Sequence, residues 1–141
     1  MVIKHNLQRF IDAQATAYPT ALSEIMSGRK RSHWMWYIFP QVQGLGFSEV
    51  SKLYALQNLA EADEYLKHPI LGKRMIEICL ELLKLASNDA TEIFGYPDDL
   101  KLKSSMTLFS SIPDTNEVFQ LVLNKFFNGT NDAKTLEILR V

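Results

Sequence analysis

The most regular apolar pattern in the chain is Ile70-Leu71-Gly72-Lys73-Arg74-Met75-Ile76-Glu77-Ile78-Cys79-Leu80-Glu81-Leu82-Leu83. Apolar residues recur in it every three or four positions, which is the spacing of one face of an α-helix. His68-Pro69 precedes the segment and Ser87-Asn88-Asp89 follows it, and both are typical of helix boundaries. The segment therefore predicts the longest helix of the protein, with one face buried.

Weaker helical patterns flank this segment on both sides, and no stretch alternates apolar and polar residues as a half-buried strand does. Tyr18-Pro19 is expected to separate the first two helices, and Gly28 and Gly95 are expected to close two others. The predicted runs are Asn6 to Ala17, Thr20 to Met26, Leu53 to Lys67, Ala90 to Phe94, Pro97 to Ile112, Asp114 or Thr115 to Phe126, and Asp132 to Leu139. The predicted fold is all-α, a compact single-domain bundle of about six to eight helices with irregular connections, spanning residues 1–141.

Length and composition agree with one cytoplasmic domain. The 141 residues, of which 47% are hydrophobic, suffice for one core and are too few to count on two. Cys79 is the single cysteine, so no intramolecular disulfide and no multi-cysteine zinc site can form, which fits a reducing compartment. No apolar run approaches the roughly 18 residues that a membrane span requires. We expect a cytoplasmic protein that does not enter a membrane, and the sequence leaves its oligomeric state open.

The segment from Gly28 to Gln41 is the richest in chemistry, because three consecutive cations precede six apolar residues that include both tryptophans. If Ser32 caps a helix that begins near His33, free N–H groups and the cations would bind phosphate or carboxylate. The aromatic rings would stack on a base or a sugar. The alternative is a solvated turn followed by a buried segment. The predicted ligand-binding residues here are Arg29, Lys30, Arg31, Ser32, Trp34, Trp36 and Gln41.

A second polar segment runs from Phe94 to Phe109. On a helix that starts near Pro97, the side chains of Asp98, Lys101 and Ser105 fall on one face, with Ser104 beside them. Serine is a mediocre helix former, so two serines inside a helix indicate a need for small side chains, either for a ligand or for close packing. Lys101, Ser104 and Ser105 are therefore predicted ligand contacts, with close packing as the alternative.

His33 and Asp98 are the predicted catalytic residues if the protein is an enzyme, which the sequence leaves open. The imidazole would serve as acid or base and the carboxylate would orient it or act as the base. A structural role is the alternative for His33, because spacing fixes no partner for it. No pair of His, Asp or Glu residues occurs at helical spacing with a third candidate ligand nearby, so no metal site is predicted. No cofactor is predicted either. The short segment Gly44-Leu45-Gly46 allows a tight turn, but without a preceding strand it is not a dinucleotide fingerprint.

The two polar segments, together with Ile38-Phe39-Pro40-Gln41, Gly44-Leu45-Gly46 and His68-Pro69-Ile70-Leu71-Gly72, resemble the bacterial family called domain of unknown function 1810. The resemblance extends from about Asn6 to Asn128. It implies a small, mainly α-helical single-domain protein and supplies no function. Some members carry the label calpastatin, which implies a calpain inhibitor. An inhibitor of that kind should be an extended, disordered chain, whereas this sequence predicts a packed globule.

Three functions remain open at this stage. The favoured one is a site, with or without catalysis, for a small anionic ligand that is nucleotide-like or a sugar phosphate. The alternative is a protein-interaction or regulatory domain in which the aromatic segment docks a partner. Nucleic-acid binding is the least favoured, because 15 basic residues face 16 acidic ones and affinity for a phosphate backbone depends on net positive surface.

Overall fold

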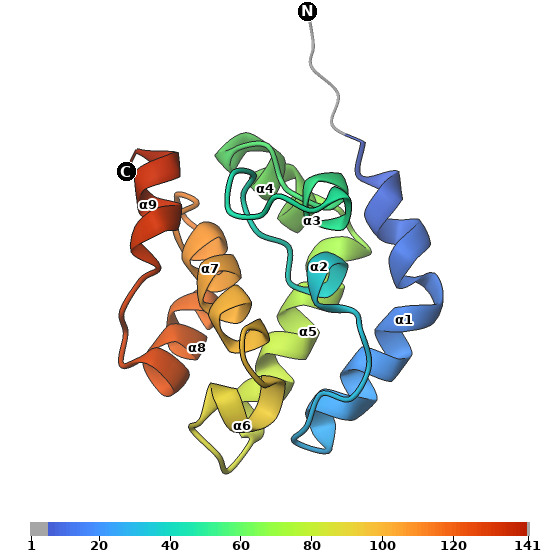
Figure 1. Cartoon of the computed structure of the whole chain (residues 1–141), viewed down its shortest axis with the longest axis vertical. Coiled ribbons are helices and arrows are strands. Elements are labelled where there is room, and N and C mark those ends of the chain that lie inside the picture. The colour runs from blue at the N-terminus through green and yellow to red at the C-terminus, as the bar shows by residue number, and fades with distance from the viewer. Residues whose placement is uncertain (1–5, 141) are drawn as a thin grey trace, which may run out of the picture.

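The computed structural model describes residues 6–140 and folds them into helices joined by short loops (Figure 1). The described residues form no β-strand, and the only pairing of extended backbone among them is a parallel bridge between Val42 and Leu56. The predicted all-α class is confirmed. The described range contains nine helices: α1 (Gln8–Met26), α2 (Met35–Ile38), α3 (Glu49–Leu53), α4 (Leu59–Lys67), α5 (Leu71–Lys84), α6 (Ala90–Phe94), α7 (Asp98–Ser110), α8 (Val118–Phe127) and α9 (Ala133–Leu139).

Helix α5 lies in the middle of the bundle and contacts α1, α4 and α8 (Figure 1). Gly72 lets α4 and α5 meet at close range, because a Cβ at this position would lie 1.9 Å from the carbonyl oxygen of Leu66. The predicted helix is confirmed, and its buried residues recur at the predicted spacing: Leu71, Met75, Ile78, Cys79 and Leu82. The prediction that it is the longest helix is wrong, because α5 has 14 residues and α1 has 19.

The predicted division of the first helical region into two helices is wrong. Helix α1 runs without a break through Pro19, whose side chain is exposed and needs no space in the core. Buried side chains on both sides of the proline keep the helix packed, and this burial outweighs the hydrogen bond that proline cannot donate. Leu7, not Asn6, occupies the N-cap position, and Gly28 closes the helix with a positive φ of 84°, as predicted.

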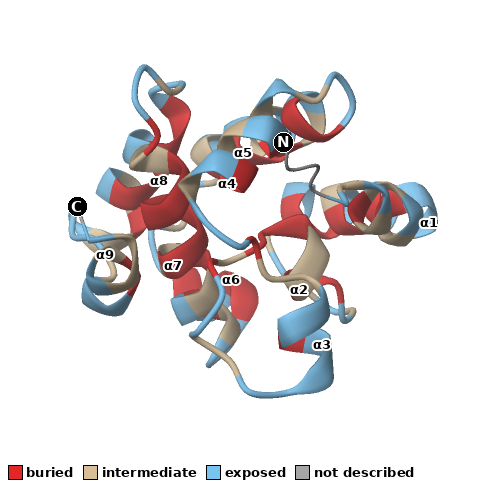
Figure 2. Cartoon of the chain, turned by 90° about the horizontal axis from the view of Figure 1, so that it is seen from above, coloured by how far each residue is buried: buried red, intermediate tan, exposed pale blue. Residues whose placement is uncertain are grey.

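The aromatic segment from Trp34 to Phe39 belongs mainly to the core. Trp34, Met35, Ile38 and Phe39 are buried, and α2 packs on α1 (Figure 2). The rings of Trp34 and Phe39 pack against Phe94 of α6, with centroids 6.4 and 5.9 Å away. The segment therefore ties α2 to α6 through its aromatic rings.

The second half of the chain follows the predicted boundaries closely. Helix α6 ends at Gly95, which has a positive φ of 77°, and α7 begins directly after Pro97. Asp132 caps α9 by accepting a hydrogen bond from the backbone N–H of Thr135 at 2.9 Å. Helix α8 begins at Val118, later than predicted, and α3 was not predicted. None of the described helices combines the length and hydropathy needed to cross a bilayer.

Candidate functional site

A buried carboxylate organises the basic segment. Glu24 of α1 accepts hydrogen bonds from the backbone N–H groups of Arg31 and Ser32 at 2.6 and 2.9 Å, from Ser32 Oγ at 2.5 Å and from Trp34 Nε1 at 3.0 Å. Burial alone would raise the pKa of Glu24, but these hydrogen bonds together lower it to about 2. The segment after Gly28 is therefore held against α1 by a side chain that is ionised at neutral pH.

Ser32 does not cap a helix, which corrects the prediction for this residue. Helix α2 begins at Met35, three residues later, and Trp34 occupies its N-cap position without a side-chain cap. The Ser32 hydroxyl donates to Glu24 instead. A four-residue helix without a side-chain cap gives no support for anion binding at its N-terminus.

The basic segment meets α7 through a carboxylate shared by two lysines. Lys30 Nζ lies 2.9 Å from Asp98 Oδ2, and Lys101 Nζ lies 3.0 Å from Asp98 Oδ1. Burial would raise the pKa of Asp98, but hydrogen bonds from Lys30 and Lys101 outweigh it and hold the pKa below its ordinary value. Two cations face one carboxylate, so the cluster keeps a net positive charge.

Lys101 also lies over Trp36, with its Nζ 4.0 Å from the ring centroid. This distance is well within the range of a cation–π contact. Trp36 is partly exposed, whereas Trp34 is only 1% exposed. Trp36 is therefore the tryptophan that can present a ring to a ligand, and Trp34, predicted to stack on one, packs in the core.

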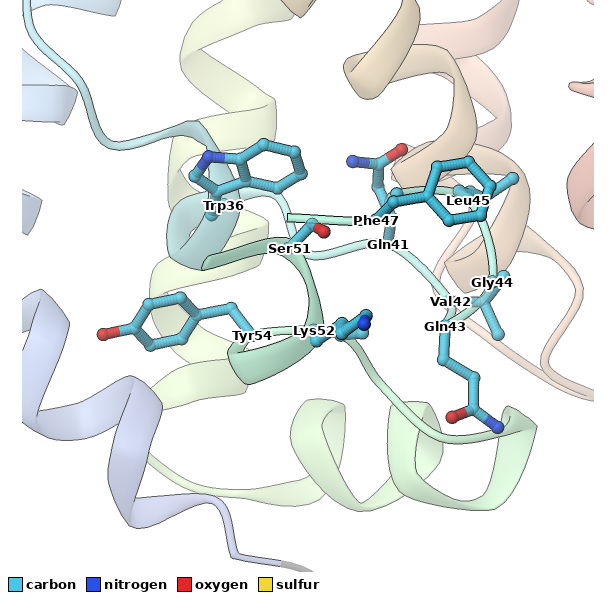
Figure 3. Close-up of a pocket in the computed structure, with 12 residues that line it drawn as sticks. Trp36, Gln41, Val42, Gln43, Gly44, Leu45, Phe47, Ser51, Lys52 and Tyr54 are labelled. Atoms are coloured by element: carbon cyan, nitrogen blue, oxygen red, sulfur yellow. The ribbon is translucent and has the colours of Figure 1, made fainter. Parts of the chain in front are cut away.

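Two adjacent hollows open around Trp36. The first has a volume of about 420 Å³ and includes Lys52 and Tyr54 in its wall (Figure 3). The second has a volume of about 330 Å³ and includes Lys101, Ser104 and Lys134. Both hollows are lined by Trp36, Gln41 and the segment 44–47. In Figure 3 the Trp36 indole and the Phe47 ring lie on either side of the Gln41 amide.

The structure brings part of the predicted set together. Among the predicted ligand contacts, those that line the second hollow are Trp36, Gln41, Lys101 and Ser104. Lys30 is held in the ion pair with Asp98, while Arg29 and Arg31 are exposed and line neither hollow. Ser105 is fully buried, which agrees with the alternative of close packing for this residue.

The predicted catalytic pair is not assembled in either hollow. The His33 side chain is exposed and lines neither hollow. The backbone carbonyl oxygen of His33 accepts a hydrogen bond from the Tyr37 hydroxyl at 3.2 Å. Asp98 is occupied by its two lysines and is absent from both linings. Among residues 6–140, no three histidine, cysteine, aspartate or glutamate side chains converge as metal ligands.

A family model described as "Protein of unknown function (DUF1810)" matches residues 4–139. The chain belongs to the DUF1810 family. No curated protein matches this DUF1810 chain.

One solved structure is similar to the DUF1810 chain over nearly its whole length. It is the crystal structure of the conserved hypothetical protein Rv1873 from Mycobacterium tuberculosis, which is 44% identical. The match covers 96% of this chain and 97% of that one, with a TM-score of 0.94. The similarity supports the fold, and neither description names a ligand or a reaction.

Several lining residues of this DUF1810 chain were outside the predicted set. Phe47, Lys52, Tyr54 and Lys134 come from loops and helices separate from the two polar segments. Gly44-Leu45-Gly46 was the nearest sequence signal, because two glycines allow a backbone to fold tightly against a neighbour. A Cβ at Gly46 would lie 2.7 Å from the Ser51 side chain, so this loop is indeed closely packed.

Proposed function

We propose that this protein binds a small anionic ligand, nucleotide-like or a sugar phosphate, in the hollows around Trp36. The observation that carries the proposal is the position of Lys101. Its ammonium group lies 4.0 Å from the Trp36 ring centroid and borders a hollow that also contains Ser104 and Lys134. A cation beside an accessible aromatic face is a combination that suits a phosphate joined to a sugar or a base.

The charge balance of the second hollow supports an anion. Lys101, Lys134 and Asp132 line it, and Lys101 is also paired with Asp98, which it shares with Lys30. Three ammonium groups therefore face two carboxylates. The Asp132 carboxylate accepts hydrogen bonds from the backbone N–H and the hydroxyl of Thr135 at 2.9 and 2.6 Å, so it is engaged in capping α9. The net charge around the second hollow is therefore positive, which favours the approach of an anionic ligand.

The other two hypotheses fit the structure less well. Most of the aromatic segment that would dock a protein partner is buried, since only Trp36 and Tyr37 of its six residues are partly exposed. The basic run is not a continuous surface for nucleic acid either. The side chain of Lys30 is only 7% exposed and turns inward to Asp98. The exposed side chains of Arg29 and Arg31 are therefore separated by a buried one and do not form a continuous basic surface.

Tryptophan fluorescence tests the proposal directly, because the two tryptophans differ in exposure. The wild-type protein is titrated with AMP, ADP-ribose and ribose 5-phosphate, and unfolding temperature is followed in parallel. At least one compound should change the fluorescence saturably and raise the unfolding temperature. The Trp36→Phe variant, which keeps the buried Trp34 as an internal reference, should lose the fluorescence response. If none of the three compounds changes either signal, the proposed function is wrong.

A further inference from the structure

We infer that the ligand is a nucleotide whose base occupies the hollow beside Tyr54 and whose phosphate occupies the hollow beside Lys101. This inference rests on the proposed function and narrows it. It selects a nucleotide over a sugar phosphate, and it specifies which end of the nucleotide lies in which hollow. It follows from the different chemistry of two hollows that share one wall.

The first hollow suits a planar heterocycle. It is the larger of the two, and Trp36, Phe47 and Tyr54 line it. The Tyr54 ring packs against Tyr37 and Phe10, with centroids 5.1 and 5.9 Å away, so Trp36 and Phe47 provide the rings on which a base can stack. Stacking on such rings is available to every base. The amide of Gln41 lies between Trp36 and Phe47 in Figure 3. The Gln41 backbone carbonyl accepts from the Leu56 N–H at 2.9 Å, and no hydrogen bond within residues 6–140 engages the side-chain amide. One carbonyl acceptor and two N–H donors are thus free to pair with the edge of a base.

The second hollow suits a phosphate. It is smaller, at about 330 Å³, and it is lined by Lys101, Lys134 and Asp132, whereas Lys52 is the one charged residue among the described residues that line the first hollow. Asp132 is engaged in capping α9, so the second hollow offers a phosphate two ammonium groups and the first offers one. Lys101 is already oriented by Asp98 at 3.0 Å and by the Trp36 ring, so little side-chain entropy is lost when an anion binds. Lys134 is exposed, and no ion pair in the described part of the chain involves it.

One molecule can reach both hollows because they are neighbours. Trp36, Gln41 and the segment 44–47 line both of them. Gly46 lets this segment lie directly against α3, since a Cβ there would be 2.7 Å from Ser51 and 3.9 Å from Trp36. Trp36 is therefore the common wall, and a ribose would lie beside it while base and phosphate extend to the two sides.

A matched ligand series tests whether both hollows contribute. Adenosine supplies the base, ribose 5-phosphate supplies the phosphate, and AMP supplies both. In calorimetric titrations of the wild-type protein, AMP should bind at least about tenfold more tightly than either fragment, because stacking and phosphate contacts act together. If ribose 5-phosphate binds as tightly as AMP, the base hollow is unused and this inference fails, while the proposed function stands. If none of the three binds, this inference fails, and the proposed function fails with it only if ADP-ribose also leaves the fluorescence and the unfolding temperature unchanged.

Substitutions in each hollow test the direction of the ligand. Lys101→Ala and Lys134→Ala should each weaken AMP and ribose 5-phosphate by about tenfold and leave adenosine unchanged. Phe47→Ala, at a side chain that is 86% exposed, should weaken adenosine and AMP and spare ribose 5-phosphate. Lys103→Ala is the control on α7, because Lys103 lies near Phe127 and borders neither hollow.

Lys52 provides the decisive comparison, because it lines the first hollow and not the second. Lys52→Ala should leave the affinity for ribose 5-phosphate unchanged. If it weakens ribose 5-phosphate while Lys134→Ala does not, the phosphate occupies the first hollow and the inferred direction is wrong. Lys134 is exposed, so its variant is not compromised by misfolding, whereas Lys101 also holds Asp98.

Discussion

Ser105 carries a fully buried hydroxyl that has no hydrogen-bond partner among the described residues. A buried hydroxyl without a partner costs about 1–3 kcal/mol relative to its hydration in the unfolded chain. Ser105→Ala removes that hydroxyl and also improves helix propensity within α7. We expect the free energy of unfolding to rise by about 1 kcal/mol, measured by urea denaturation.

The neighbouring serine is the matched control. Ser104 Oγ donates to the Leu100 carbonyl oxygen at 3.1 Å, so Ser104→Ala gains the same helix propensity but loses a hydrogen bond. The Ser104 variant should therefore be less stabilising than the Ser105 variant. If Ser105→Ala destabilises the protein instead, its hydroxyl has a partner and the interpretation is wrong.

Glu24 is the second single residue with a large expected effect. Its pKa of about 2, against an ordinary value of 4.5, means that the folded state favours the ionised carboxylate. The resulting stabilisation is complete above the unfolded pKa and is lost as pH falls from 4.5 toward 2. Glu24→Gln should lower the free energy of unfolding at neutral pH by about 2 kcal/mol, because charge-assisted hydrogen bonds are lost.

The pH dependence separates this effect from a simple packing defect. The difference in unfolding free energy between wild type and Glu24→Gln should shrink as pH falls from 4.5 toward 2, since the wild type then loses the same charge. Glu137→Gln on the exposed side of α9 should match the wild type at every pH. A difference between wild type and Glu24→Gln that stays constant across this pH range would contradict the proposed role of the charge.

Between elements, α4 and α5 meet at close range at Gly72. Helix propensity alone would make Gly72→Ala stabilising by about 1 kcal/mol. The new Cβ would lie 1.9 Å from the Leu66 carbonyl oxygen, so the two helices must separate. We expect the variant to be destabilised by about 1–3 kcal/mol in urea denaturation, opposite in sign to the propensity effect. Lys73→Ala, at an exposed position next to it, should be nearly neutral, and a stabilised Gly72→Ala variant would refute the close contact.

Element boundaries were predictable where a local signal and tertiary packing agree. The apolar period of α5, the glycine after α6 and the aspartate before α9 all mark boundaries that the structure contains. The predictions of a helix break at Pro19 and of a helix cap at Ser32 were wrong, because tertiary contacts override the local preferences of both residues. Pro19 lies on the exposed face of a helix whose other face is buried. The Ser32 hydroxyl donates to the Glu24 carboxylate, which lies eight residues earlier on α1 and is a stronger acceptor than a neutral group.

The candidate site is a property of the whole molecule and was predictable only in part. The sequence singled out two polar segments, and the Lys30–Asp98 ion pair joins them. It could not decide which tryptophan is buried, because six consecutive apolar residues show no period. Lys52, Tyr54 and Lys134 reach the hollows from elements whose approach depends on tertiary packing, for which no local pattern exists.

A single hydrophobic core also predicts how the molecule unfolds. The buried apolar side chains from α1 to α8 form one continuous cluster, and α5 contacts both α1 and α8, which lie in opposite halves of the chain. A domain of this kind unfolds in one cooperative transition. In the Trp36→Phe variant, fluorescence reports only on Trp34, which packs beside Phe39 and Phe94, whereas far-ultraviolet circular dichroism reports on all helices. We expect the two urea transitions to coincide. Separate midpoints would mean that the segment around Trp34 is a distinct folding unit, which unfolds without loss of the core around α5.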